Sequence, residues 1–158
     1  MTFIVDGTNG LTFPNSTVQA SAGNVLQVVS ATSTSSFSTS SGSFVTTGFS
    51  ASITPKFSTS KVLVQFSVFN MVQGGNMAAA ITIYRGGTSL DTTGFAQVYA
   101  QTGSSTTTGA GSGVYLDSPA TTSSTTYTLY FRNQNNNGTV TLNSSTGIMS
   151  IVLMEIAA

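Results

Sequence analysis

Residues 61–69 read KVLVQFSVF, and this stretch decides the fold. Its side chains alternate with a period of two, which is the spacing of successive side chains along a β-strand. One face of the predicted strand carries only apolar residues, which are Val62, Val64, Phe66 and Val68. The other face is mixed, with Gln65 and Ser67 between Leu63 and Phe69. The stretch therefore predicts a strand whose apolar face packs against a core.

The same period extends to both sides of this strand. Residues 125–132 (TTYTLYFR) place Tyr127, Leu129 and Phe131 on one face. Residues 147–157 (GIMSIVLMEIA) are apolar on both faces, as in a strand covered on two sides. Residues 77–84 (MAAAITIY) suit a helix in isolation, but their Ile-Thr-Ile-Tyr end favours a strand. Glycine, serine and asparagine dominate 102–113 and 133–138, which are predicted as loops.

These patterns predict an all-β protein with essentially no helix. Roughly eight to ten short strands with irregular spacing are typical of an antiparallel jelly-roll or β-sandwich. We expect this knob to span residues 25–158, because the strand pattern is continuous from residue 25 onward. A chain of 158 residues is long enough to bury one substantial core.

Residues 1–24 form a separate unit, which we interpret as an extended N-terminal attachment arm. Two apolar runs flank Asp-Gly and Asn-Gly pairs, which favour tight turns. A frayed terminus rarely exposes so many large apolar groups, so we expect the arm to dock on another protein. The docking residues would be Phe3, Ile4, Val5, Leu11 and Phe13.

The composition argues against an enzyme. The chain has four basic and four acidic residues, no histidine and no cysteine, while 52 residues are serine or threonine. Imidazoles, thiols and ionised groups carry out most proton transfer, nucleophilic attack and metal binding. Ser58 and Lys61 match an S-x-x-K string by chance, since the other motifs of that chemistry are missing. We expect no catalytic residues, no cofactor and no metal site, and regard Asp91 and Asp117 as turn residues.

The charge pattern also limits the partners. The basic residues Lys56, Lys61, Arg85 and Arg132 are scattered, so no stripe exists that would bind nucleic acid. No stretch approaches the ~20 apolar residues of a membrane span, so no membrane insertion is expected. The net charge is zero, which removes the self-repulsion that keeps protein molecules apart and favours assembly.

Glu155 stands out because it lies in the apolar stretch IVLMEIA. An unpaired carboxylate there would cost several kcal/mol. Its side chain either reaches the solvent-facing edge or pairs with a basic residue, for which Lys56 and Arg132 are candidates. Because the stretch is apolar on both faces, we predict a homotrimer in which residues 147–157 contribute to the central core or to the subunit contact. Ile151, Leu153 and Glu155 are the candidates for the contact.

Several strings resemble a known group of proteins. The opening IVDGTNGLTFPNSTVQASAG (4–23) is similar to the N-terminal segment of many tailed-bacteriophage fibre and virion structural proteins. The resemblance continues through four further strings, which are SITPKFSTSKVLV (52–64), IYRGGTSL (83–90), LDSPATTSSTTYTLYFR (116–132) and GIMSIVLMEIAA (147–158). In such proteins the last pattern ends a knob that looks like a trimeric jelly roll of the C1q/TNF type. The resemblance thus implies a virion protein, made in the host cytoplasm and carried on the phage particle.

Two functions are favoured at this point, and a non-viral adhesin or carbohydrate-binding module is the third that remains open. The first is a trimeric capsid decoration (cement) protein that stabilises the head, with the arm bound to the major capsid protein or another virion protein. The second is a receptor-binding tail-fibre or tail-tip protein, whose loops 102–113 and 133–138 would grip a host surface glycan. Four tyrosines offer faces on which a sugar could stack, which are Tyr84, Tyr99, Tyr115 and Tyr130. The short chain, with one knob and no repetitive shaft, favours the first.

Overall fold

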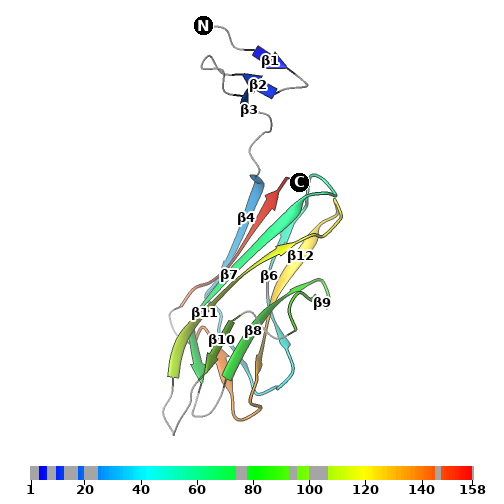
Figure 1. Ribbon diagram of the computed structural model, residues 1–158. Coiled ribbons are helices and arrows are strands. Elements are labelled where there is room, and N and C mark those ends of the chain that lie inside the picture. Colours follow the sequence, from blue (N-terminus) through cyan, green and yellow to red (C-terminus); the bar gives the residue numbers. More distant parts are fainter. Residues whose placement is uncertain are drawn as a thin grey trace.

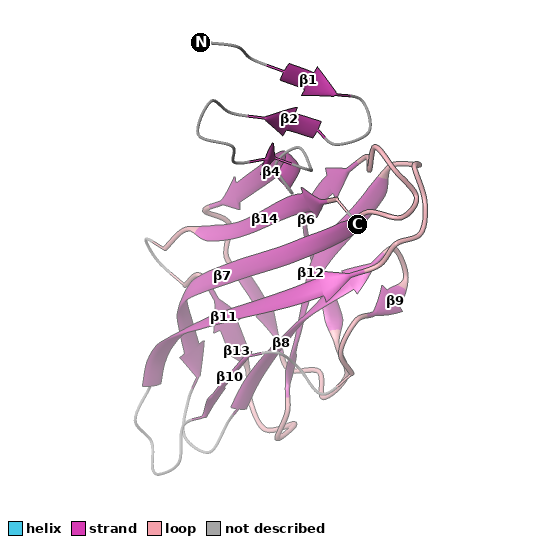
Figure 2. Ribbon diagram, turned by 45° about the horizontal axis from the view of Figure 1, so that its top comes forward, coloured by secondary structure: helices cyan, strands magenta, loops and turns pink. Residues whose placement is uncertain are grey.

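The computed structural model describes residues 4–6, 10–12, 18–19, 25–73, 78–92, 96–99, 107–144 and 147–157. All the regular elements that these residues form are β-strands, as the sequence predicted (Figure 1). Two antiparallel sheets face each other in a sandwich-like arrangement, and a separate small sheet lies near the N-terminus (Figure 2). The predicted all-β fold is therefore confirmed, including a strand where residues 77–84 were ambiguous.

The strands fall into three sheets. The first contains β1 (Ile4–Asp6), β2 (Gly10–Thr12) and β3 (Val18–Gln19). The second, here called the β12 sheet, contains β6 (Val45–Ile53), β8 (Ala78–Arg85), β9 (Thr88–Ser89), β10 (Ala96–Tyr99) and β12 (Thr125–Asn133). The third, here called the β7 sheet, contains β4 (Val25–Ser33), β5 (Phe37–Thr39), β7 (Lys61–Gln73), β11 (Thr107–Asp117), β13 (Val140–Leu142) and β14 (Met149–Ile156).

Eight strands of the two larger sheets pair in a nested order. β4 pairs with β14, β6 with β12, β7 with β11 and β8 with β10, all antiparallel. The chain thus resembles one long hairpin whose two halves pair from the outermost strands inward. The remaining pairs, β14 with β7 and β12 with β8, join these ribbons sideways into the two sheets. Pairs within one sheet are therefore contacts between segments far apart in sequence.

The core lies between the two sheets and follows the predicted alternation. On β7 the side chains of Val62, Val64, Phe66 and Val68 are at most 2% exposed. On β12, Tyr127, Leu129 and Phe131 are likewise buried. Phe49, Ala51 and Ile53 from β6 complete the facing layer. The alternation in the sequence therefore predicted correctly which side chains of β7 and β12 face the core.

The outer face of β8 is also buried, which the sequence did not predict. Ala78, Ala80 and Thr82 alternate with core residues yet are at most 3% exposed. The Thr82 hydroxyl donates a hydrogen bond to the Asp91 carbonyl oxygen at 2.7 Å, so the segment after β9 contributes to the cover of this face. Small alanine side chains allow such close cover on both sides of one strand.

The prediction of a loop over 102–113 is wrong for its second half. Residues 107–113 belong to β11, which pairs with β7 along nearly its whole length. Gly113 lies opposite Phe66 and Gly111 opposite Val68, so glycines stand beside large core side chains. A register shift between Gly109 and Gly111 marks a bulge in the same region. These glycines therefore belong to a paired strand, whereas the sequence suggested a flexible loop.

Serine and threonine hydroxyls bond across neighbouring strands of both sheets. Ser38 pairs with Thr141, Ser52 with Thr126, and Ser67 with Ser150, each with 2.8 Å between the two oxygens. Cross-strand hydroxyl pairs of this kind each contribute roughly 0.2–1 kcal/mol. The many hydroxyls therefore serve the sheets as lateral links as well as hydrating their surfaces.

Replacing Phe66 by alanine should lower the free energy of unfolding by about 3–5 kcal/mol, because the change leaves a cavity between the two sheets. The matched control is Gln65→Ala, which alters the exposed neighbour on the same strand and should cost less than about 0.5 kcal/mol. Urea unfolding followed by circular dichroism at one fixed protein concentration measures both. Equal midpoints for the two variants would contradict the placement of the core.

Candidate interaction surface

One row of apolar side chains crosses the outer face of the β7 sheet. Val28 on β4 is in register with Met154 on β14, Met154 with Leu63 on β7, and Leu63 with Leu116 on β11. We call these four residues the outer row. They point away from the core because their neighbours on each strand point into it. Val28 is 57% exposed and Leu116 is 49% exposed, so the row ends are open to solvent.

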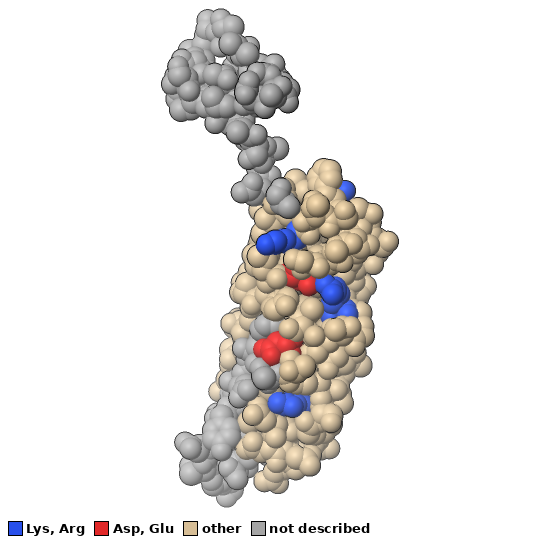
Figure 3. Space-filling view, turned by 45° about the vertical axis from the view of Figure 1, so that its right-hand side comes forward, with Lys and Arg blue, Asp and Glu red and all other residues tan. Residues whose placement is uncertain are grey.

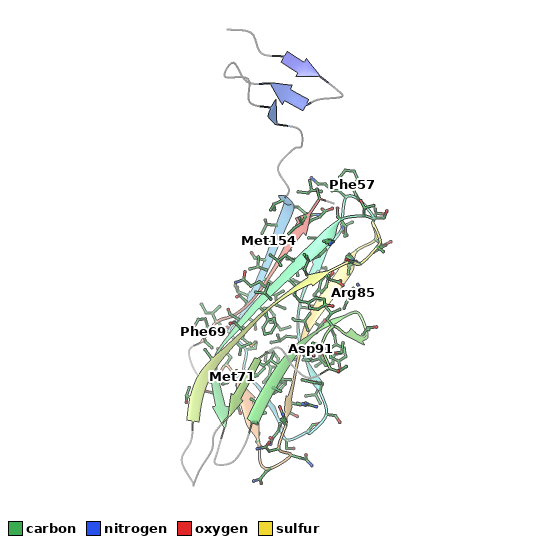
Figure 4. The ribbon with its side chains drawn as sticks, in the orientation of Figure 1. Phe57, Phe69, Met71, Arg85, Asp91 and Met154 are labelled. Atoms are coloured by element: carbon green, nitrogen blue, oxygen red, sulfur yellow. The ribbon has the colours of Figure 1, made fainter. Side chains whose placement is uncertain are left out.

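The described residues around the outer row, on the outer face of the β7 sheet, include no acidic side chain. The next row along the strands contains Val152 and Val114, which lie on either side of Gln65. On the other side, Ile156 is opposite Val25, with Lys61 as its other neighbour. Beyond Val152 the face turns to hydroxyls, where Ser150 meets Ser67. Figure 4 shows Met154, labelled, on this strand. The outer row is thus the centre of an apolar band that the Ser150–Ser67 pair adjoins on one side and Lys61 on the other.

The residues predicted for the subunit contact lie elsewhere. Ile151, Leu153 and Glu155 are 0% exposed within the single chain. Their side chains face the core, so they have no surface to offer to a second copy. The alternate residues of β14, Val152 and Met154, are the ones on the outer face, where they are half-buried. Ile151, Leu153 and Glu155 therefore lie in the core of the single chain, and the other side chains of β14 form its outer face.

Glu155 is held by hydrogen bonds and not by a cation. Its Oε2 accepts a 2.6 Å bond from the Gln27 side-chain amide, and its Oε1 accepts a 2.7 Å bond from the Lys56 backbone N–H. The Phe57 backbone N–H approaches Oε1 at 3.4 Å. The Lys56 ammonium group instead donates to the Leu26 carbonyl oxygen at 3.2 Å. Both interpretations from the sequence, a solvent-facing carboxylate and a salt bridge to Lys56 or Arg132, are therefore wrong.

These hydrogen bonds fix the connection between β6 and β7 against β4 and β14. Gln27 donates at 2.6 Å both to Glu155 and to the Thr54 carbonyl oxygen, so it joins the carboxylate to the start of that connection. Burial by itself raises the pKa of Glu155, but the hydrogen bonds from Gln27 and the two backbone amides outweigh it and hold the pKa below its ordinary value. The carboxylate is therefore ionised while fully buried.

A second buried carboxylate, Asp117, is paired directly. Arg85 Nη1 donates to Asp117 Oδ1 at 2.7 Å and to Oδ2 at 2.8 Å, and the Tyr127 hydroxyl donates to Oδ2 at 2.6 Å. Burial raises the pKa of Tyr127 well above its ordinary value, and the bond to the charged Asp117 adds to the rise. Tyr127 thus remains a donor at any physiological pH. Both oxygens of Asp117 therefore accept hydrogen bonds from side chains of the same chain.

The predicted docking residues of the arm are only partly described. Phe3 and Phe13 lie outside the described residues, and for Ile4, Val5 and Leu11 only the backbone is described. The two apolar runs pair with each other, because Val5 on β1 is opposite Leu11 on β2. β3 then pairs with β2, so these parts of the predicted extended arm form a small sheet. β4 begins at Val25, where the sequence placed the boundary of the knob.

The surface carries few charges. Figure 3 shows one face of the molecule on which basic and acidic atoms form small, scattered groups. Within the described ranges, no group of three or more His, Cys, Asp or Glu side chains is arranged to hold a metal ion. No helix in the described part of the chain is long and apolar enough to cross a bilayer.

No protein-family model matches this chain, and no curated protein sequence matches it. Its function must therefore be argued from its own residues.

Replacing Glu155 by glutamine should lower the free energy of unfolding at pH 7 by about 1–3 kcal/mol, because an amide nitrogen would face donors that now bond to an oxygen. The pKa of Glu155 in the folded chain lies below the ordinary 4.5, so its stabilisation is complete above that pH and is lost as the pH falls through the folded-state value. Denaturant unfolding from pH 7 to pH 3 should show the two proteins converging at the acidic end. A difference that stays constant across this range would contradict the ionised, hydrogen-bonded carboxylate.

Proposed function

We propose that the protein is a non-enzymatic structural protein of a tailed-bacteriophage virion, which assembles as a homotrimer and decorates the capsid surface. The observation that carries the proposal is the outer row, an apolar line across four strands with exposed ends. Contiguous apolar area of this kind on a soluble protein marks an interaction site. The chain is made in the host cytoplasm and works on the particle.

The nested strand order supports a jelly-roll for the knob. Pairing of β4 with β14, β6 with β12, β7 with β11 and β8 with β10 is the order obtained when one long hairpin rolls into two sheets. Jelly rolls of two such sheets are frequent in viral coat proteins. The resemblance of the terminal GIMSIVLMEIAA string to C1q/TNF-type knobs points to the same architecture.

The chemistry of the outer row favours further copies of the chain as the occupant. Val28, Met154, Leu63 and Leu116 have no acidic neighbour on the outer face, so another apolar face can cover them without burying an unpaired carboxylate. A threefold ring uses one heterologous contact three times and leaves no free end. Zero net charge adds no repulsion between the copies.

The arm supplies the attachment. We assign it the binding of the major capsid protein or a neighbouring virion protein, through Phe3, Ile4, Val5, Leu11 and Phe13. At about 25 cal/mol per Å², burying five such side chains contributes on the order of 5–10 kcal/mol before ordering costs. Three arms on one trimer act together, which raises the overall affinity far above that of one arm.

The alternative of a receptor-binding tail tip loses part of its basis. Its gripping loops were 102–113 and 133–138, and the second half of the first loop is strand β11. The shorter the free loop, the less surface it offers to a receptor. Decoration of the capsid therefore remains the preferred function.

Introducing a charge into the outer row should break the trimer. Val28→Asp places a carboxylate at an exposed position, so the single chain should still fold while the contact loses its apolar match. Light scattering at micromolar concentration should give three times the 16.2 kDa chain mass for the unchanged protein and one chain mass for the variant. Ser50→Asp, on the outer face of the β12 sheet, is the control and should remain trimeric. A monomeric unchanged protein would refute the trimer.

Copy number on purified particles tests the decoration role. A quantified gel should show the protein at roughly one copy per capsid subunit, because a decoration protein follows the capsid lattice. Tens of copies or fewer would instead indicate the tail tip.

Deleting residues 1–20 should leave a folded trimer that no longer binds particles lacking the protein. A truncated trimer that still decorates them at the normal level would show that the knob itself attaches.

A further inference from the structure

A pocket opens at the end of the sandwich where β12 begins. It lies between the β8–β9 turn and the segment that joins β11 to β12, on the side of the molecule where Figure 4 labels Arg85. Its volume is about 370 Å³, within the range of small-molecule sites. The residues that line it include Arg85, Gly86, Pro119, Thr121, Ser124 and Thr125. It is separate from the outer row and from the arm.

The Arg85 guanidinium is held in place, but only some of its N–H donors have a partner among the described residues. Nη1 is bound to both oxygens of Asp117 and lies 3.4 Å from the Ser118 carbonyl oxygen. A guanidinium has five N–H donors, of which Nη1 carries two. The donors on Nε and Nη2 therefore have no partner among the described residues. The side chain is 33% exposed while Asp117 is 6% exposed, so the buried carboxylate holds a partly accessible cation in place.

The walls of the pocket are held by their own hydrogen bonds. The Gly86 N–H donates to the Thr126 carbonyl oxygen at 3.0 Å, which ties the β8–β9 turn to β12. The Ser123 N–H donates to the Thr121 hydroxyl at 3.0 Å, and the Thr125 hydroxyl donates to the Ser123 carbonyl oxygen at 3.1 Å. A pocket with fixed walls loses less conformational entropy when a ligand binds.

The lining selects a polar ligand with one negative charge. The Nε–Nη2 edge of a guanidinium matches a carboxylate with two parallel hydrogen bonds. The hydroxyls of Thr121 and Ser124 suit ligand hydroxyls, because each can both donate and accept, whereas Thr125, whose proton is bound to the Ser123 carbonyl oxygen, can only accept. Pro119 is the one largely apolar side chain in the lining, so an apolar ligand gains little.

We propose that this pocket binds an acidic monosaccharide unit, a pyranose ring that carries a carboxylate. The carboxylate pairs with the free edge of Arg85, and the ring hydroxyls bond to the threonine and serine hydroxyls of the wall. The site does not rest on the virion proposal, because it uses neither the outer row nor the arm. Since Asp117 already neutralises Arg85, the affinity is modest, with a Kd on the order of 1 mM.

Isothermal titration calorimetry of the full-length protein with sodium glucuronate tests the site, with glucose and acetate as comparison ligands. We expect glucuronate to bind with a Kd of ~1 mM, and each comparison ligand to bind at least about tenfold more weakly, since each supplies only half of the contacts. Glucose binding equal to glucuronate would overturn the role of the carboxylate. No heat from glucuronate at concentrations far above ~1 mM would overturn the site itself.

Two variants locate the binding on Arg85 and its pocket. Arg85→Lys keeps a cation beside Asp117 but removes the planar edge, and should weaken glucuronate binding about tenfold or more. Ser124→Trp leaves every hydrogen bond described above intact and fills the pocket, so it should also abolish binding if Arg85→Lys proves unstable. Arg132→Lys is the matched control, because it makes the same change beside Phe44. Unchanged binding in both pocket variants, or equal loss in the control, would place the ligand elsewhere and refute the proposal.

Discussion

The two-residue period of β7 is the constraint on which the rest of the structure depends. β7 pairs with other strands along both edges, with β14 and β13 on one side and β11 on the other. Its register therefore determines which side chains of each neighbouring strand face the core. Because Val64 points into the core, Leu63 must point out, and the residues paired with each follow the same rule. The core and the outer row are therefore two consequences of one alternation. A slip by one residue would exchange them.

The sequence was sufficient to predict which side chains face the core in strands whose alternation is regular. It was insufficient where the facing of a side chain depends on which strands pair. In residues 61–69 and 125–132 the local alternation itself indicates which side chains face the core, so their core residues were predicted correctly. Met154 belongs to the outer row only because Val28 and Leu63 flank it, and a register between distant strands leaves no trace in a local pattern. For Ile151 and Leu153 the sequence could not separate a core position from a subunit contact, because both faces of β14 are apolar.

Two other failures have physical causes of their own. Glycines 109, 111 and 113 resemble loop residues, yet they lie in β11, where pairing with the long strand β7 outweighs the low strand propensity of glycine. The donors to Glu155 include backbone amides of residues 56 and 57, and any residue type supplies a backbone amide. A search for oppositely charged side chains cannot find such partners. Strand β8 adds the same lesson, because its outer cover comes from a segment that no local pattern identifies.

The two buried carboxylates close one end of the sandwich. Glu155 and Asp117 both lie in register with Val62, on β14 and β11 respectively, so they occupy one row across the β7 sheet. One is satisfied by neutral donors and the other by Arg85 and Tyr127. The same row therefore anchors the β6–β7 connection and presents the partly exposed guanidinium beside the β11–β12 segment. The row at the end of the apolar core thus also positions the polar groups around it.

The cross-strand hydroxyl pairs have a consequence for the medium in which the protein works. Bonds such as Ser38–Thr141, Ser52–Thr126 and Ser67–Ser150 join neutral groups, so dissolved ions do not screen them as they screen exposed charge pairs. With eight ionisable acidic and basic side chains in the whole sequence, little of the folding energy is left for screening to remove. Charge screening by dissolved salt therefore has little to act on in these sheets.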